Sequence, residues 1–270
     1  SACYEAGIYE IDFGRKKIVR QYLETEPDYE IYAKSYSLSF RSGCIKGGAL
    51  FTCTHSEIIE FDLSEFRTMD RFSHPLFNDL HHVNKIGDRI YFASTGIDHV
   101  GEIGHDGEVR VWPVSDDRAV ASIDLEKDYR RESTKPHKIH PNHISAIDDE
   151  IWVTRFNEKD AICLSDPRKK MNIHYGKPHD GLLKDGKIHF TTVNGMVVVF
   201  DCQSFECISC HNIPSRYKGP HPGWCRGLEI AGGYAYIGFS SFRWTLSLGN
   251  LKFLAKNVAS LGRRISRDLP

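Results

Sequence analysis

Short apolar runs alternate with polar positions over the first 240 residues, and tight polar turns separate the runs. Five segments repeat one order: an apolar strand, a turn rich in glycine or acidic residues, and a second apolar strand. Alternation with a period of two is typical of half-buried strands, so each segment predicts a β-hairpin. A third apolar run follows in four of the five, as at residues 57–62 and 196–201. The first strands of the hairpins begin at Arg41, His82, His143, His179 and Arg226.

The fifth repeat lacks a third strand, whereas the chain begins with two strands that follow no hairpin, at residues 7–12 and 17–22. If these N-terminal strands complete the last repeat, they close a ring and leave no sheet edge open. The repeat spacing suits four-stranded blades. We therefore predict an all-β fold, a five-bladed β-propeller over residues 1–245, with a polar insertion at about residues 115–136 as a surface loop or short helix.

After residue 245 the apolar positions recur at offsets of three and four, with basic residues between them. This spacing predicts a basic amphipathic helix. We expect residues 246–270 to form a C-terminal helical extension packed on the propeller, and a membrane-surface or partner contact is the alternative. The apolar stripe consists of Leu251, Leu254, Val258, Leu261 and Ile265.

The charge balance narrows the classes of partner. Lys and Arg number 35 and Asp and Glu number 36, for a formal net charge of −1, so no overall field favours a nucleic acid. No stretch approaches the ~18 consecutive apolar residues of a membrane span. The eight cysteines are scattered, which favours free thiols in a cytoplasmic protein. We expect no nucleic-acid partner and no membrane span, and the oligomeric state is left open.

The segment Cys207–His211 matches the haem c attachment pattern. The preceding residues predict a strand and a hairpin turn, which would place Cys207 and Cys210 on a second strand. Their offset of three then puts them on opposite faces, whereas haem attachment needs both sulfurs on one side. We therefore expect no haem.

Aligning the five first strands on their turns places one ionisable residue of each strand at the same position. In a propeller the first strand of each blade lines the central channel, so equivalent positions form a ring. Burying so many ionisable side chains in a channel is unfavourable unless something binds them. The predicted ring consists of Arg41, His82, His143, His179 and Arg226.

The histidine triad of this ring indicates a metal site. Neutral imidazole is a common metal ligand, and three ligands with open remaining positions describe a catalytic site. We predict one divalent transition metal ion (Fe, Zn, Cu, Mn or Ni) bound by His82, His143 and His179. The position of His179 assumes a four-residue turn, and a three-residue turn would place Asp180 in the ring instead. The alternative is that these histidines are hydrogen-bonded channel fillers.

The remaining ring residues and their neighbours suggest further roles. Arg41 and Arg226 present planar forks suited to an anionic substrate group, unless they pair with Glu229 or another acid. Trp224 would supply a wall for the substrate. Neighbouring polar residues would orient the ligands or transfer protons, and Asp180 and His81 are the candidate catalytic groups. The other such candidates are Asp79, Asn142 and Cys225, of which Cys225 is expected to point away from the ring.

Five short motifs resemble those of a family of largely uncharacterised bacterial propeller proteins, sometimes found near glycan-biosynthesis genes. The resemblance covers about residues 2–243 and implies a propeller without a settled activity. More distantly, the chain is similar in concept to carotenoid oxygenases and gluconolactonase-like hydrolases. It lacks the fourth histidine of the former and the carboxylate-rich calcium set of the latter, so neither reaction is carried over. The motifs are Asn78–Val83, His140–His143, Lys177–Gly181, Trp224–Leu228 and Ile237–Ser240.

Two functions follow from these patterns. The first is a metal-dependent enzyme acting on a small anionic substrate, with hydrolase, lyase and oxygenase chemistry all open. The alternative is a non-catalytic propeller that binds a glycan or a protein partner. Metal content distinguishes the two.

Overall fold

The computed structural model describes residues 5–24, 38–216 and 223–240. Over these ranges the chain consists of antiparallel β-sheets, which confirms the predicted all-β class. The helices are single turns: α1 (Arg118–Ala121), η1 (Thr95–Ile97) and η2 (Pro214–Arg216). No helix in the described ranges is long and apolar enough to cross a membrane.

Four sheets have four strands each, hydrogen-bonded in chain order. The first consists of β3 (Cys44–Lys46), β4 (Ala49–Cys53), β5 (Ile58–Asp62) and β6 (Arg67–Phe72). The second consists of β7 (Leu80–Ile86), β8 (Arg89–Ser94), β9 (His99–Ile103) and β10 (Val109–Pro113). The third consists of β11 (Pro141–Ile147), β12 (Glu150–Arg155), β13 (Asp160–Cys163) and β14 (Lys170–Asn172). The fourth consists of β15 (Pro178–Lys184), β16 (Lys187–Thr192), β17 (Met196–Asp201) and β18 (Cys207–Asn212).

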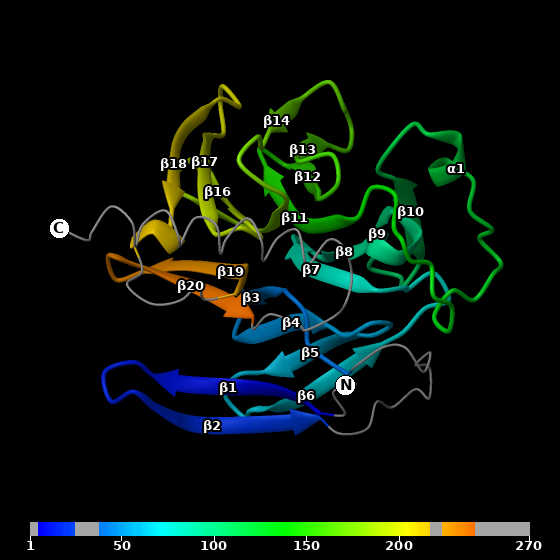
Figure 1. Ribbon diagram of the computed structural model, residues 1–270. Coiled ribbons are helices and arrows are strands. Elements are labelled where there is room, and N and C mark those ends of the chain that lie inside the picture. The colour runs from blue at the N-terminus through cyan, green and yellow to red at the C-terminus, as the bar shows by residue number, and fades with distance from the viewer. Residues whose placement is uncertain (1–4, 25–37, 217–222, 241–270) are drawn as a thin grey trace.

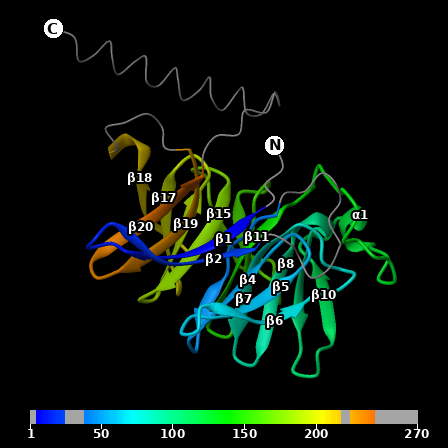
Figure 2. The same cartoon turned by 90° about the horizontal axis from the view of Figure 1, so that it is seen from below.

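Two further sheets are hairpins. They consist of β1 (Ala6–Asp12) with β2 (Lys17–Glu24), and of β19 (Trp224–Ala231) with β20 (Tyr234–Ser240). The sheets are arranged around a common centre, with the first strand of each four-stranded sheet innermost (Figure 1). Neighbouring first strands are in contact, from β7 through β11 and β15 to β19. The view at right angles shows the sheets standing side by side (Figure 2). The centre of the molecule is therefore lined by first strands, as predicted.

Two-residue turns join the first and second strands in all five repeats. Both residues have positive φ at Gly47–Gly48, Asp148–Asp149, Asp185–Gly186 and Gly232–Gly233. Type I′ turns have this property, and their twist matches that of the flanking strands. The turns are thus shorter than the three- and four-residue turns assumed from the sequence, which changes the alignment of the repeats.

A β-bulge interrupts β7, β11, β15 and β19 at the same distance from the turn. In β7, for example, Leu80 pairs with Ser94 and His82 with Ala93, so His81 is the extra residue. A bulge bends the strand and redirects a side chain. Because of it, two consecutive residues of a first strand can both serve the central region, which simple alternation would forbid.

The apolar core lies between successive sheets rather than at the centre of the ring. One cluster joins Trp152 and Met171 of the third sheet to Ile188 and Phe190 of the fourth. A second joins the first and second sheets, and a third joins the second and third sheets. The second and third sheets therefore each bury both faces against a neighbouring sheet, which leaves their first-strand edges free to carry polar groups.

Part of the insertion after β10 is hydrogen-bonded to the segment that precedes β7. The side-chain amide of Asn78 donates to the carbonyl of Glu132 (3.0 Å) and to that of Tyr129, and the Thr134 hydroxyl donates to Asn78 Oδ1 (3.1 Å). Asn78 is fully buried. These bonds fix residues 129–134 close to the start of β7.

The predicted closure by the N-terminal strands is not observed as one sheet. The hairpins β1–β2 and β19–β20 are separate two-stranded sheets. The rings of Phe13 and Tyr236 nevertheless lie 4.7 Å apart, which brings the two hairpins into contact. The predicted helical extension, residues 246–270, lies outside the described residues.

Candidate functional site

Three buried side chains from three sheets meet at the centre. His82 on β7, His143 on β11 and Asp180 on β15 each offer one ligand-type atom, and these atoms lie within 4.8 Å of one another. The two imidazole rings are 4.4 Å apart between centroids, and His143 Nε2 is 3.9 Å from Asp180 Oδ1. This is the one such His, Cys, Asp or Glu group found in the part of the chain that the structure describes.

These residues occupy one position in the repeats, four residues before the last strand residue ahead of the turn. We call this set the inner layer: Ser42, His82, His143, Asp180 and Gly227. The Ser42 hydroxyl donates to Asp180 Oδ2 (2.8 Å), and the Gly181 amide donates to Asp180 Oδ1 (2.9 Å). The carboxylate is therefore held in one orientation from two sides.

A glycine makes room for the imidazole of His143. A Cβ atom added at Gly181 would lie 2.8 Å from the His143 ring, which is closer than real Cβ atoms approach. The Nδ1 atom of His143 is buried and has no hydrogen-bond partner, whereas Nδ1 of His82 accepts from the Ile144 amide (3.3 Å). One nitrogen of the inner layer is thus buried without the partner that such a group normally has.

Burial sets the protonation of the inner layer. It lowers the pKa of His143 to about 3 and, together with the neighbouring His143, holds the pKa of His82 well below its ordinary value. Burial raises the pKa of Asp180 to about 6, although the Ser42 and Gly181 hydrogen bonds oppose the rise. Both imidazoles are therefore neutral at pH 7, and the carboxylate charge is retained against a desolvation penalty.

The residue before each inner-layer residue belongs to a second group. We call this set the outer layer: Arg41, His81, Asn142, His179 and Arg226. His81 Nδ1 lies 2.6 Å from Asn142 Oδ1, and the Asn142 amide donates to the Pro178 carbonyl (3.1 Å). The His81 and His179 rings are 6.2 Å apart. Burial, and then the charge of Arg226, holds the pKa of His179 well below its ordinary value.

Asp79 is the carboxylate around which the outer layer is organised. It is 1% exposed and has a left-handed φ of 46°, a conformation that is unusual for a residue other than glycine. Burial alone would raise its pKa, but hydrogen bonds from His55 and His81 and the charge of Arg41 hold the pKa below its usual range. Its oxygens lie 3.2–3.8 Å from basic groups of Arg41, His55, His81, Lys135 and His137.

Two more histidines extend this network. His140, with a left-handed φ of 63°, places Nδ1 3.1 Å from Nδ1 of His137 and packs its ring against His81 at 4.7 Å. Burial, and then the charges of His81 and His137, lowers the pKa of His140 to about 2. The sequence analysis placed His140 in a motif, His140–His143, but gave His140 and His137 no role. Their spacing of three in a loop carries no periodic signal.

The structure distributes the residues of the predicted ring over the two layers. His82 and His143 hold the positions expected, whereas Arg41, His179 and Arg226 lie one residue earlier than the inner layer. The structure therefore brings Asp180, the alternative for a shorter turn, to the two histidines in place of His179. Ser42 and Gly227, which the sequence alignment did not place in the ring, fill the remaining positions.

The two arginines have different surroundings. Arg41 Nη2 pairs with Asp79 Oδ1 at 3.2 Å, so one arginine does contact an acid, as the alternative to substrate binding supposed. Arg226 Nε donates to the Ser240 hydroxyl (3.3 Å), and its guanidinium lies 5.8 Å from the ring centre of Trp224. Arg226 and Trp224 are both half-buried on β19.

Among the described cysteines, Cys225 lies nearest to the two layers in sequence, and its environment does not favour a nucleophile. Burial raises the pKa of Cys225 to about 12, so its thiol stays protonated. In β18 a bulge beside Ile208 pairs Cys207 with Phe200 and Cys210 with Val198. Phe200 and Val198 share a face, so Cys207 and Cys210 are not on the opposite faces that their offset predicted.

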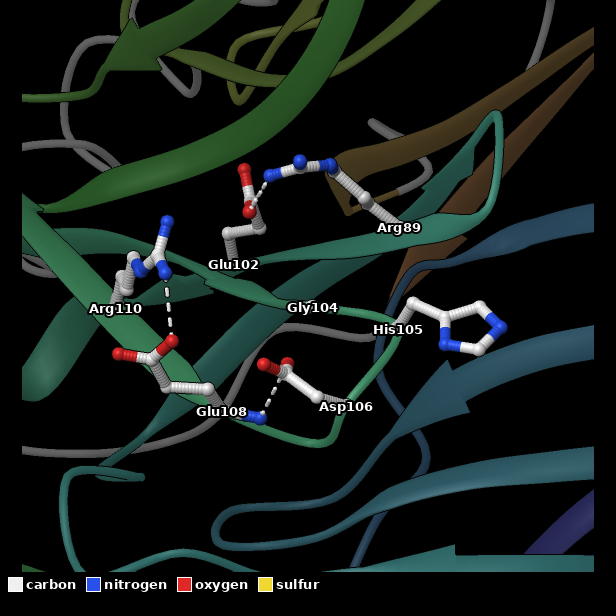
Figure 3. Close-up of a pocket in the computed structure, with 7 residues that line it drawn as sticks. All are labelled: Arg89, Glu102, Gly104, His105, Asp106, Glu108 and Arg110. Atoms are coloured by element: carbon white, nitrogen blue, oxygen red, sulfur yellow. Dashed lines mark hydrogen bonds and ion pairs between the residues drawn. The ribbon is translucent and has the colours of Figure 1, made fainter.

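A separate polar pocket of about 320 Å³ lies at the β9–β10 turn and includes no residue of either layer (Figure 3). Its ion pairs, Arg89 with Glu102 and Arg110 with Glu108, are already formed. His105 points away from the other lining residues in Figure 3. We assign no chemistry to this pocket, because its charges satisfy one another.

No protein-family model matches the chain, and no curated protein matches it. Among solved structures, a catalytically inactive virginiamycin B lyase variant from Staphylococcus aureus with quinupristin is 12% identical, with a TM-score of 0.51 over 78% of this chain and 73% of that chain. Selenomethionine-substituted virginiamycin B lyase from the same organism is 13% identical, with a TM-score of 0.50 over 70% of this chain and 59% of that chain. A streptogramin B lyase structure is 14% identical, with a TM-score of 0.49 over 70% of this chain and 57% of that chain. The chain thus spans less than two thirds of the length of two of these structures. At such identities the likeness shows the fold alone, which is propeller-like.

Proposed function

We propose that this protein is a metal-dependent enzyme that binds one divalent transition metal ion through His82, His143 and Asp180 and acts on a small anionic substrate. One observation carries the proposal. Three ligand-type side chains from three sheets converge, buried, within 4.8 Å, at one position of the repeated strands.

The donor set fits a first-row metal. Two neutral imidazoles and a carboxylate suit Fe, Mn, Zn, Ni or Cu better than Ca or Mg, which prefer oxygen ligands. A cation would compensate the buried charge of Asp180 and supply a partner for the buried nitrogen of His143. Three protein ligands leave positions open, as in catalytic rather than structural sites. When bound, the ion would act as a Lewis acid on the substrate or on water.

The outer layer provides a group for proton transfer. His81 lies one residue from the ligand His82, with Nε2 3.7 Å from Asp79 Oδ1 and Nδ1 2.6 Å from Asn142 Oδ1. The two polar neighbours orient the imidazole, as a general acid–base requires. Such a group favours hydrolysis or elimination over oxygen chemistry. Arg41, Arg226 and Trp224 would bind the substrate next to it.

We also propose that the fold is a five-bladed propeller of residues 1–245 with a helical extension of residues 246–270 packed on it. The contact between Phe13 and Tyr236 supports a fifth blade shared by β1–β2 and β19–β20. Exposed apolar side chains on β1–β2, among them Ile11, Ile18 and Leu23, support a covering segment. Seven cysteines of the described residues are free, in keeping with a cytoplasmic location.

Elemental analysis of protein purified without added metal tests the function. We expect about one transition metal ion per chain, as a single site binds one. His82→Ala, His143→Ala and Asp180→Ala should each lose most of the metal, whereas the matched variants His179→Ala and His211→Ala should keep it. All five need circular dichroism to show a retained fold. If the wild-type protein contains no metal and binds none on addition, the glycan- or protein-binding propeller becomes the better account.

A further inference from the structure

We propose that the outer layer is a binding site for a tetrahedral oxyanion, the phosphate or sulfate group of the substrate, and that His179 donates a hydrogen bond to this anion. The inference names the substrate class of the site proposed above, and its catalytic meaning rests on that proposal. The binding itself does not need the metal, which makes the two separable by experiment.

Buried nitrogens without hydrogen-bond partners lie in the outer layer and beside it. They are Nε of Arg41, which is always a donor, Nδ1 of His179, and Nε2 of the neighbouring His137, whose side chain is 2% exposed; each imidazole nitrogen is a donor in one of its two neutral tautomers. Buried donors without acceptors are rare in folded proteins, because each one loses its hydrogen bonds to water. Unpaired donors gathered in one place are what a site for a hydrogen-bond acceptor presents.

The charge of the layer has the matching sign. Asp79 is shared among five basic groups, so its single negative charge is already committed to Arg41 and its neighbours. Arg226 adds a second guanidinium that acts on His179. Two guanidiniums, of which Arg41 pairs with Asp79, supply the positive charge that an anion would meet in this layer.

The directions of the donors select the shape of the anion. Arg41 precedes β3, His179 lies on β15 and Arg226 lies on β19, so the donors come from three sheets. A carboxylate has two oxygens in one plane and is best met by one arginine fork. A phosphate or sulfate group has acceptor oxygens in a tetrahedral arrangement, which suits donors carried by three different sheets better than the planar carboxylate does.

The outer layer is placed so that a phosphate or sulfate ester of the substrate would lie beside the proposed metal site. His179 and Arg226 are half-buried, whereas His82, His143 and Asp180 are buried, so the outer layer lies between solvent and the inner layer. Each metal ligand follows an outer-layer residue directly in the chain. A substrate bound by its phosphate or sulfate would therefore place the adjoining atoms next to the ion.

Calorimetric titration with inorganic phosphate, inorganic sulfate and acetate tests the proposal, on metal-loaded protein and on protein stripped by a chelator. We expect phosphate or sulfate to bind at least about tenfold more tightly than acetate, in both forms, because acetate offers fewer acceptors. The tighter of the two tetrahedral anions identifies the ester class. His179→Ala and Arg226→Met should each weaken this binding by about tenfold and leave metal content unchanged.

The matched control is His189→Ala, which removes a half-buried histidine on β16, outside both layers. It should bind the anions as the wild type does. Equal affinity for acetate and phosphate, or loss of metal in His179→Ala, would overturn the proposal, and so would anion binding by metal-loaded protein alone. If stripped protein binds phosphate but no variant of the inner layer changes metal content, the anion site stands and the proposed metal function fails.

Discussion

The inner and outer layers differ by one residue in each strand, yet their environments are opposite. His82, His143 and Asp180 are buried and carry one carboxylate between them, whereas the outer layer carries two guanidiniums, of which Arg41 pairs with Asp79 and has a side chain that is 27% exposed. The bulges make this possible, because they let consecutive residues serve the same central region. The same repeated bulge thus supports an inner layer that contains a carboxylate and an outer layer that contains two guanidiniums.

The largest expected effect comes from removing the ion of the inner layer. A ligand present at a thousand times its Kd stabilises the folded state by about 4 kcal/mol, so chelation should lower the free energy of unfolding by about that amount. Urea titration of wild-type protein with saturating metal and with chelator measures it. His143→Ala should show no difference between the two conditions, whereas His179→Ala should show the full difference. Equal responses of the two variants would remove the distinction between the layers.

The second effect concerns the carboxylate when no metal is present. The pKa of Asp180 is about 6 in the folded protein and near 3.8 unfolded, so metal-free protein loses stability as the pH rises from about 4 to about 6. The shift corresponds to about 3 kcal/mol above pH 6. Asp180→Asn should recover most of this lost stability in metal-free protein at pH 7.5. The asparagine amide can accept a hydrogen bond from the Gly181 N–H and donate one to the Ser42 hydroxyl, and it carries no charge.

The same substitution should remove the stabilisation by metal. Thermal or urea unfolding with and without chelator therefore gives opposite signs for one variant: more stable than wild type without metal, less stable with it. A destabilised metal-free Asp180→Asn protein would show that the carboxylate serves the fold and not an ion.

The third effect is a loss of folding stability at acidic pH, caused by the buried histidines around the outer layer. The pKa of His140 is lowered to about 2, so its contribution to stability is complete above the unfolded value of about 6.5 and is lost as the pH falls toward 2. Between pH 7 and pH 5 this one residue should account for about 2 kcal/mol of lost stability. His140→Gln should flatten the pH dependence of the free energy of unfolding by that amount.

The exposed His105 supplies the control for this comparison. His105→Gln is the matched substitution of an exposed histidine that belongs to neither layer, and it should not reproduce the effect of His140→Gln. An unchanged slope in His140→Gln would mean that the outer layer already contains a compensating charge.

Part of this arrangement was predictable from the sequence, and the errors have a physical cause. The repeats, the all-β class and the histidines His82 and His143 follow from apolar alternation and from turns that come directly after Ile86 and Ile147. The repeats were aligned on the last isoleucine or leucine before each turn, and this alignment fails where that residue is exposed and is not the last residue of the strand. Ile45 is 66% exposed and Leu183 is 43% exposed, and each precedes a lysine that is still part of the strand. The alignment on these markers therefore shifted Arg41 and His179 by one residue.

Other features leave no pattern in a single sequence. A bulge depends on how two strands pair, so the extra residues His81 and His179 look like ordinary alternating positions. Asp79 as a shared carboxylate also depends on long-range packing, since its neighbours include His55 and His137 from distant loops.

The smallest effect tests how closely the strands of the inner layer approach. Gly181→Ala would place a methyl group 2.8 Å from the His143 ring, so the ring must move, whereas a Cβ at Gly227 meets only Asp180 Oδ2 at 3.8 Å, an ordinary contact. Overpacking of this kind costs about 1 kcal/mol or somewhat more. Gly181→Ala should lower the free energy of unfolding by that amount and also weaken metal binding, because His143 is displaced. Gly227→Ala should change neither by more than about 0.5 kcal/mol, as expected of an uncrowded site. Urea titration measures the free energy of unfolding of the two variants, and metal titration measures their affinity for the ion. Equal losses in both variants would show that the two glycines serve only the backbone. The close packing of His143 against β15 would then not position the ligand.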